Sequence, residues 1–283
     1  MARVPVPARS PGRGQSSIGA DMLATLALLL TLLTLLPVAG DVRSQGRPAA
    51  RDLMAQLSSA DPAARARAAC GLRELGDDAA AALDALVALL PDGAPVEQSV
   101  CERNWGRWNN QHTTTPGEQA ASTLVSIGGR TLKPLLAAVK HSSWIARRNA
   151  AWALGALDDR SASDALLGAL ADAESPVREQ AAWALGALDD TAATPKLTAA
   201  LKDESAKVRR QAAWALGAID DPRAVDPLMR ALKDGDADVR EQAAWALGAI
   251  GDSRAVDALL PALQDAHPGV RRQAAWAIGV LSR

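Results

Sequence analysis

The sequence predicts an all-α protein, a right-handed solenoid of about six to seven stacked helix pairs. The first observation is a repeated motif, because AAWALGA occurs at 150–156, 181–187, 212–218 and 243–249 and AAWAIGV follows at 274–280. The second is the constant period of 31 residues, a length typical of arrays built from small repeated units. The third is the composition, 48% hydrophobic with no Phe and no Tyr, in which alanine and leucine favour closely packed helices.

Each period contains a longer and a shorter helical pattern, separated by a turn. In the period 203–233, apolar residues recur three and four positions apart, as they do on one side of a helix. The residues expected to be buried are Val208, Ala212, Ala215, Leu216 and Ile219 in the longer helix and Val225, Leu228 and Leu232 in the shorter one. Asp220 and Asp221 are expected to cap the shorter helix, which Pro222 can begin. Such a small pair cannot bury its own apolar face, so neighbouring repeats must complete the core.

The repeat pattern continues in weaker form toward the N-terminus, as far as about residue 48. Its first segments match, in order, a second helix at 50–59, a first helix at 61–75 and a second helix at 79–90. A degenerate repeat follows at 117–140, with Ser122 in the tryptophan position. At the C-terminal end, we expect the array to finish on a long helix without a companion.

An insertion at 91–116 interrupts the array. It is rich in Gly, Pro, Asn and Thr, and it contains Trp105 and Trp108. Insertions in repeat arrays form exposed loops and often belong to the binding face. Cys101 also lies in the insertion, while Cys70 occupies the tryptophan position of the first repeat. We expect a Cys70–Cys101 disulfide that holds the insertion over the N-terminal end of the array; two free thiols are the alternative.

Residues 1–40 have the features of a targeting segment. Arginines precede an apolar run at 22–38, and small residues suited to cleavage follow it near Ala39. The run is also close to the shortest length that spans a membrane, so an uncleaved anchor in the inner membrane is the alternative to a cleaved signal peptide. Both interpretations place a linker at 41–47 and the solenoid at 48–283 outside the cytoplasm, either periplasmic or secreted, where disulfides persist.

The repeating stretch VRRQAAWALGAIDDPRAVDPLMRALKD resembles the short HEAT-like repeats of the type first associated with phycobilin lyases and common in bacterial scaffold proteins. The resemblance is strong over 141–283 and weaker from about residue 48. It implies an Asp–Arg ladder between repeats, made by an aspartate six residues before an arginine. The positions concerned are Asp172/Arg178, Asp203/Arg209, Asp234/Arg240 and Asp265/Arg271. Where His141 stands in the aspartate position, the ladder should be interrupted.

The repeated tryptophan does not fall on the core side of its helix. At about 100° per residue, Trp183 lies opposite Ala181 and Leu185 and beside Glu179 and Gln180. The resemblance implies that this side lines a concave groove. Two interpretations stay open: an exposed ladder that binds a partner, and a structural layer in which each ring packs on small residues of the next repeat. The candidate binding residues are Trp152, Trp183, Trp214, Trp245, Trp276, Gln180, Gln211 and Gln242, with Trp105 and Trp108 of the insertion.

Charges on the tryptophan side alternate from repeat to repeat. The residues four positions before each tryptophan are Arg148, Glu179, Arg210, Glu241 and Arg272, and we expect neighbours to neutralise one another. The chain has a net charge of −1 and a pI of about 6.3, which excludes the basic footprint of a nucleic-acid-binding protein. Indole rings, amides and paired charges suit an extended peptide, a protein surface or a glycan.

Sequence features of an enzyme are scarce. With three His, two Cys and neither CxxC nor HExxH, the chain offers no metal or cofactor site, and no catalytic set stands out. We expect a non-catalytic scaffold for protein–protein interaction that binds a protein or an extended peptide in the tryptophan-lined groove. A glycan-binding module of the cell wall is the alternative. The third hypothesis is a lyase-type enzyme related to phycobilin lyases, although a shared fold does not carry function.

Overall fold

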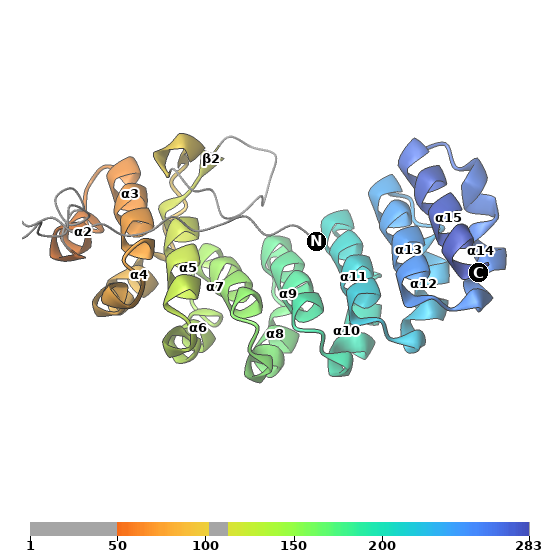
Figure 1. Ribbon diagram of the computed structural model, residues 1–283, viewed down its shortest axis with the longest axis horizontal. Helices are drawn as coiled ribbons and strands as arrows, with labels where there is room; N and C mark the ends of the chain where they lie inside the picture. Colours follow the sequence, from red (N-terminus) through yellow and green to blue (C-terminus); the bar gives the residue numbers. More distant parts are fainter. Residues whose placement is uncertain (1–49, 102–112, 283) are drawn as a thin grey trace, which may run out of the picture. The chain divides into compact units, whose positions relative to one another are not determined.

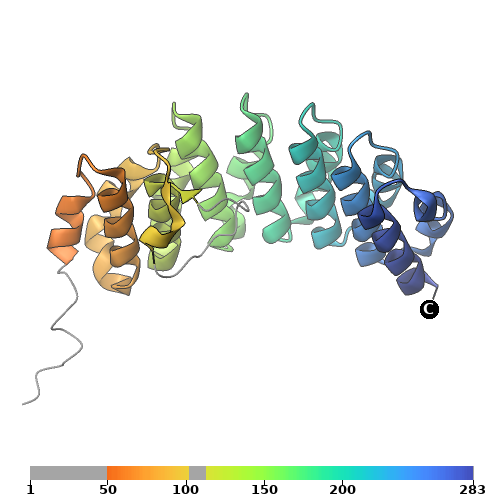
Figure 2. The ribbon, with the colours of Figure 1, turned by 90° about the horizontal axis from the view of Figure 1, so that it is seen from above.

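The computed structural model describes residues 50–101 and 113–282, and within them it is an all-α solenoid, as predicted. The helix pairs follow one another in chain order along a single row (Figures 1 and 2). The long helices are α3 (Pro62–Arg73), α5 (Pro116–Ile127), α7 (Trp144–Ala156), α9 (Ser175–Ala187), α11 (Ala206–Ile219), α13 (Ala237–Ile250) and α15 (Pro268–Leu281).

Each long helix except α15 is followed by a short one. The short helices are α4 (Leu83–Leu89), α6 (Leu132–Ala138), α8 (Ser163–Ala169), α10 (Thr194–Ala200), α12 (Val225–Ala231) and α14 (Val256–Leu259). A further short helix, α2 (Ala50–Gln56), precedes α3. The described part therefore holds six complete pairs. Within the described residues, α15 is the last long helix and no short helix follows it.

The connections between the helices of each pair are short 3₁₀ helices. These are η1 (Gly76–Ala82), η3 (Gly129–Thr131), η4 (Arg160–Ala162), η5 (Thr191–Ala193), η6 (Pro222–Ala224) and η7 (Ser253–Ala255), with η8 (Pro261–Gln264) after α14. Asp221 caps η6 by accepting a hydrogen bond from the Arg223 amide. Asp221 therefore caps the 3₁₀ helix that leads into α12, whose own N-cap is Ala224, and the prediction that Asp220 caps the shorter helix is wrong. Asp220 ends α11 in the left-handed conformation at φ 55°, which aspartate tolerates better than most residues.

The core lies between the long and the short helices and between successive long helices. All eight residues predicted to be buried in the period 203–233 are at most 8% exposed. Small residues set the spacing of the long helices: a Cβ added to Gly186 would lie 2.7 Å from Cα of Ala215 on the next long helix. The small residues of the AAWALGA motif therefore allow the backbones of successive long helices to approach closely.

A ladder of arginine–aspartate pairs joins the repeats, as the resemblance implied. Each arginine pairs with the aspartate 25 residues later, in the following repeat. The rungs are Arg147–Asp172 at 2.6 Å, Arg178–Asp203 at 2.7 Å, Arg209–Asp234 at 2.8 Å and Arg240–Asp265 at 2.7 Å. The Arg240 hydrogen bond lowers the pKa of Asp265 to about 2. These side chains are largely buried, so the ladder ties neighbouring repeats together.

The same arginines also organise the loop before their own helix. Arg178 donates through Nη1 to the backbone carbonyl of Asp172, at 2.8 Å. The ladder is interrupted at His141, as expected. The arginine position that would reach His141 is occupied by Pro116, which cannot donate, and no rung joins these two residues within the described ranges.

The insertion adds a small sheet, which the all-α prediction did not include. Strand β1 (Val96–Glu97) pairs with β2 (Thr113–Thr114) in antiparallel fashion, and η2 (Gln98–Val100) follows β1. Thr115 then begins α5 with a capping box, in which its hydroxyl accepts from the Glu118 amide. Trp105 and Trp108 lie outside the described residues.

None of the helices in 50–101 and 113–282 is long and apolar enough to cross a membrane. The predicted targeting segment 1–40, its apolar run at 22–38 and the linker at 41–47 lie outside the described residues.

Candidate functional site

The repeated tryptophans define one surface of the long helices, which we call the tryptophan face: Trp152, Trp183, Trp214, Trp245 and Trp276, with the residues three and four positions before each. The first four rings are half-buried, and Trp276 is 44% exposed. On α9, Glu179 and Gln180 are half-buried beside Trp183, whereas Ala181 and Leu185 are fully buried. The helical geometry thus places these rings away from the core between the helices of a pair.

From Trp183 onward, one edge of each ring packs on a glycine of the preceding repeat. Atom Cζ3 of Trp183 would lie 3.0 Å from a Cβ added to Gly155, and the same distance is 2.8 Å for Trp214 over Gly186. Trp245 over Gly217 and Trp276 over Gly248 repeat this contact at 2.9 and 2.6 Å. Glycine is therefore required at this position, since any side chain would collide with the indole. These rings therefore pack on the preceding repeat at one edge while the side chains as a whole are only half-buried, as the packing interpretation expects. The interpretation as a binding ladder stays a prediction.

Aromatic contacts differ along the tryptophan face. Trp152 and Trp183 stack, with ring centroids 6.5 Å apart and planes at 20°. Arg148 lies 5.8 Å from the ring centroid of Trp144, a cation–π contact. Trp144, 37% exposed, was not among the predicted site residues. The sequence does contain a pattern that indicates it. Trp144, Arg148 and Trp152 follow one another at intervals of four residues, which places them on the same side of α7.

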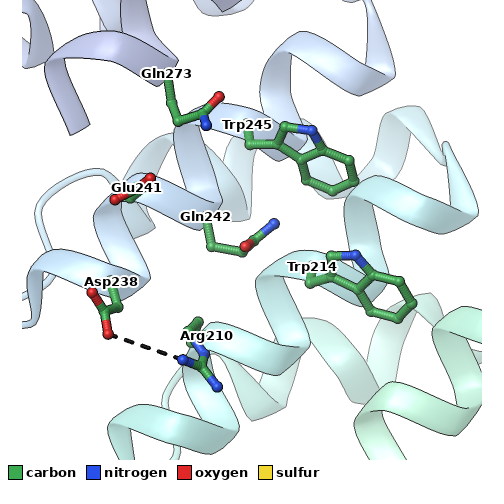
Figure 3. Close-up of a pocket in the computed structure, with 7 residues that line it drawn as sticks. All are labelled: Arg210, Trp214, Asp238, Glu241, Gln242, Trp245 and Gln273. Carbon is green, nitrogen blue, oxygen red and sulfur yellow. Dashed lines mark ion pairs between the residues drawn. The ribbon is translucent and has the colours of Figure 1, made fainter. Parts of the chain in front are cut away.

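Between α11 and α13, the tryptophan face contains a hollow of about 430 Å³. Its lining residues are Arg210, Trp214, Asp238, Glu241, Gln242, Trp245 and Gln273. Figure 3 shows the two indole rings side by side in the same orientation, with the Gln242 amide between them and the charged groups. This is a shape that a ligand chain could enter, lined by aromatic faces and amide groups rather than by a single charge.

The charged residues of the face form separate pairs instead of the continuous row that was expected. Glu179 pairs with Arg210 at 3.6 Å and Glu241 with Arg272 at 3.5 Å. A further pair, Arg148 with Glu118 at 2.8 Å, extends the pattern to α5. Within the described residues, no pair joins Arg148 to Glu179 or Arg210 to Glu241. The reason at Glu241 is its position beside α15, where His267 also lies 3.7 Å away.

Arg210 completes the charges around the hollow. Its second contact is with Asp238, at 4.0 Å (Figure 3). Exposed pairs of this kind each contribute about 0–1 kcal/mol. Their effect on the site is to keep it close to neutral, so neither a strongly anionic nor a strongly cationic ligand is favoured.

The amides three positions before the tryptophans fall into two groups. Gln180, Gln211, Gln242 and Gln273 make no side-chain hydrogen bond within the part of the chain that the structure describes. Asn149, at the same position on α7, donates to the Leu90 carbonyl at 2.9 Å and is buried. Gln119 on α5 is also buried and donates to the Thr114 hydroxyl at 2.9 Å. In the first group the Gln180 oxygen is nevertheless buried. In the second group, Gln119 contacts the insertion and Asn149 contacts the residue directly before it.

The predicted Cys70–Cys101 disulfide is present, with the two Cα atoms 6.0 Å apart. Cys70 is buried on α3 in the tryptophan position, and Cys101 directly follows η2. The bond therefore fixes the first strand of the insertion to the long helix beneath it. Among the described residues, no cluster of three or more His, Cys, Asp or Glu side chains could hold a metal ion.

Comparison with known proteins agrees with this fold. A family model for HEAT repeats matches residues 132–206 and 194–279, together more than half of the sequence. The chain belongs to the HEAT-repeat family. No curated protein matches it.

Several solved structures resemble this HEAT-repeat protein. The CpcE–CpcF complex of phycocyanin lyase from Nostoc sp. PCC7120 is 25% identical, with 82% of this chain and 93% of that chain covered and a TM-score of 0.46. A structure of Kap95p bound to RanGDP is 15% identical, covers 82% of this chain and 37% of that chain, and has a TM-score of 0.59. A designed armadillo repeat protein in complex with the peptide (KR)4 is 20% identical, with 81% and 98% covered and a TM-score of 0.50.

Proposed function

We infer that this HEAT-repeat protein is a non-catalytic interaction scaffold that binds a protein or an extended peptide on its tryptophan face. One observation carries the proposal: from α9 to α15, each repeat offers one accessible indole edge and one glutamine amide without a partner in the described chain. A large rigid ring gives contact area at little entropic cost, which is why tryptophan is frequent in binding hot spots.

The hollow between Trp214 and Trp245 is the centre of the proposed site, and we place the tryptophan face on the concave side of the array. Paired charges around the hollow favour a neutral stretch of ligand. The shared fold supports a binding role, since Kap95p binds RanGDP and the designed armadillo protein binds a peptide. The Cys70–Cys101 disulfide supports an oxidising compartment outside the cytoplasm, in agreement with a targeting segment at 1–40.

A selection from a random-peptide library on the immobilised protein tests this function. Peptides should be enriched on the wild type, and their binding should weaken about tenfold or more in Trp214→Ala. Leu260→Ala is the matched control, because Leu260 is a large hydrophobic residue, 49% exposed, outside the tryptophan face. Enriched peptides that bind Trp214→Ala as well as the wild type would contradict the proposal.

Unfolding of Trp214→Ala by urea separates binding from folding. Because one edge of the ring is packed and the other accessible, we expect a loss of about 1–2 kcal/mol, less than the about 3–5 kcal/mol of a fully buried aromatic. A loss of about 3 kcal/mol or more would show that the ring is mainly part of the packed structure. Retention of the wild type, but not of Trp214→Ala, on insoluble cell-wall glycan would favour the glycan-binding alternative.

A further inference from the structure

The hollow between α11 and α13 has two unlike walls. Figure 3 shows two indole rings on one side of it and the charged side chains on the other. The aromatic wall is formed by Trp214 and Trp245, and the polar wall includes Arg210, Asp238 and Glu241. The volume of about 430 Å³ lies in the range of about 300–1,000 Å³ for pockets that hold small molecules. One large side chain of a ligand, together with its own main chain, therefore fits the hollow.

The aromatic wall lacks a ring partner. Trp152 and Trp183 stack on each other with centroids 6.5 Å apart, within the range of about 4.5–7 Å for favourable aromatic pairs. Within the described residues, Trp214 and Trp245 make no such contact with each other or with another ring. Both border the hollow instead. An aromatic side chain of a ligand can therefore make there the ring contact that Trp152 and Trp183 make between themselves.

The polar wall has hydrogen-bonding groups without close partners. Arg210 lies 3.6 Å from Glu179 and 4.0 Å from Asp238. Glu241 lies 3.5 Å from Arg272, whereas the pairs of the arginine–aspartate ladder are 2.6–2.8 Å apart. Among the described residues, no side chain that lines the hollow makes a hydrogen bond shorter than 3.5 Å. A purely apolar ligand would remove water from these groups without replacing their hydrogen bonds, which is unfavourable.

The charges of the polar wall favour an uncharged group. Each carboxylate already has an arginine within 4.0 Å, so a charged ligand group finds no unpaired partner. A hydroxyl is uncharged and is both donor and acceptor, so it can bond a carboxylate and an amide at once. Glu241 is a better acceptor than Asp238, because its side chain is 27% exposed against 64% and hydrogen bonds are stronger where water is excluded.

An aromatic ring that carries an uncharged hydroxyl matches both walls, and tyrosine has this combination. We propose that the hollow is the anchor site for a tyrosine side chain of the bound peptide. The ring packs against Trp214 and Trp245, and the hydroxyl donates to the Glu241 carboxylate and accepts from the Gln242 amide. The proposal rests on the proposed function and names the residue by which the tryptophan face selects its partner.

Titration with N-acetyl-tyrosinamide, followed through the indole N–H resonances of the isotope-labelled protein, tests the proposal. We expect the resonances of Trp214 and Trp245 to shift. The affinity should be about tenfold higher than for N-acetyl-phenylalaninamide, which lacks the hydroxyl, and about tenfold higher than for N-acetyl-lysinamide, which is charged. Equal affinity for the tyrosine derivative and either of the other two, or shifts confined to other tryptophans, would overturn the proposal.

Two variants separate the contributions of the walls. Trp214→Ala should weaken the binding of the tyrosine and phenylalanine derivatives alike, by about tenfold. Glu241→Gln removes the charged acceptor and keeps its shape, so it should lower only the affinity for the tyrosine derivative, to about that of the phenylalanine derivative. Leu260→Ala should change neither affinity, and circular dichroism shows whether each variant remains folded. An undiminished preference for tyrosine in Glu241→Gln would overturn the proposal.

The random-peptide selection separates this proposal from the proposed function. Enriched peptides that contain tyrosine and depend on Trp214 would support both. Enriched peptides that depend on Trp214 but tolerate alanine in place of every tyrosine would leave the function standing and overturn the tyrosine anchor. Failure of any enriched peptide to depend on Trp214 would overturn both.

Discussion

In the N-terminal half of the array, from α3 to α7, side chains at the repeat positions that face away from the core make contacts with other parts of the same chain. Cys70 and Ser122 replace the tryptophan, and Gln119 and Asn149 use their amides to hold β2 and the Leu90 carbonyl. In the C-terminal half, from α9 to α15, the same positions carry tryptophan and glutamine, and the glutamine amides have no partner in the described chain.

This difference shows how one repeat serves two purposes. The helix positions and their spacing are common to both halves. Arginine–aspartate pairs also occur in both, with Arg65–Asp92 at 2.6 Å on α3, although the ladder is interrupted at His141. Where an insertion must be held, the outward positions are buried and bonded. Where no described residue covers them, they remain largely half-buried, and the proposed binding site lies there. The two halves can therefore be tested against each other with matched substitutions.

The largest expected effect belongs to the disulfide of the N-terminal half. The Cys70–Cys101 bond closes a loop of 31 residues, for which the chain-entropy estimate is about 3–4 kcal/mol. Urea unfolding of Cys70→Ser/Cys101→Ser should show a loss of that order. Hydrogen exchange should rise in α3 and β1 and stay unchanged in α11 and α13. An unchanged unfolding midpoint, or two alkylatable thiols in exported protein, would contradict the role assigned to this bond.

The next effect concerns the ladder that both halves share. Arg178→Ala removes the partner of Asp203, and both side chains are largely buried, so we expect a loss of about 3 kcal/mol. Arg271→Ala is the matched control. Among the described residues, Arg271 donates only to the backbone carbonyls of Asp265 and Ala266 at an exposed position, and its loss should be about 1 kcal/mol or less. Equal losses measured by urea unfolding would show that the ladder does not tie the repeats together.

A smaller effect is expected from the glycines beneath the indoles. In Gly217→Ala the new Cβ would lie 2.7 Å from Cβ of Ala246 and 2.9 Å from Trp245, so overpacking should cost about 1–3 kcal/mol. In Gly279→Ala the Cβ meets nothing within 4 Å, and helix propensity should add up to about 1 kcal/mol of stability. Thermal unfolding distinguishes the two signs. A neutral Gly217→Ala would mean that the rings do not pack on the preceding repeat.

Much of the fold could be predicted because the same sequence pattern occurs in several successive repeats. The buried set around Val208 and Leu216 followed from helical spacing, and the place of Trp183 followed from the same geometry. The Cys70–Cys101 pair could be expected because one cysteine stood in a repeat position and the other in the insertion.

The features that were missed have no repeat to reveal them. The other repeats have no tryptophan at the position of Trp144, so the repeated pattern did not predict it as a site residue. The two-residue strands at 96–97 and 113–114 are too short for an alternating pattern to show. The division of the charges into separate pairs depends on which way Glu241 turns, toward Arg272 or toward Arg210, and spacing alone does not determine this. The same holds for Asn149, whose burial comes from contact with a distant carbonyl.

One measurement tests the contrast between the halves most directly: the free energies of unfolding of Asn149→Ala and Gln242→Ala, determined side by side. Both change an amide three residues before a tryptophan. Asn149→Ala leaves the Leu90 carbonyl without its donor, and we expect a loss of about 1–3 kcal/mol. Gln242→Ala should stay within about 0.5 kcal/mol of the wild type, since its amide has no partner in the described chain. If Gln242→Ala lost as much stability as Asn149→Ala, the glutamines of the tryptophan face would serve to hold the fold together. The account of this face as a binding surface would then be wrong.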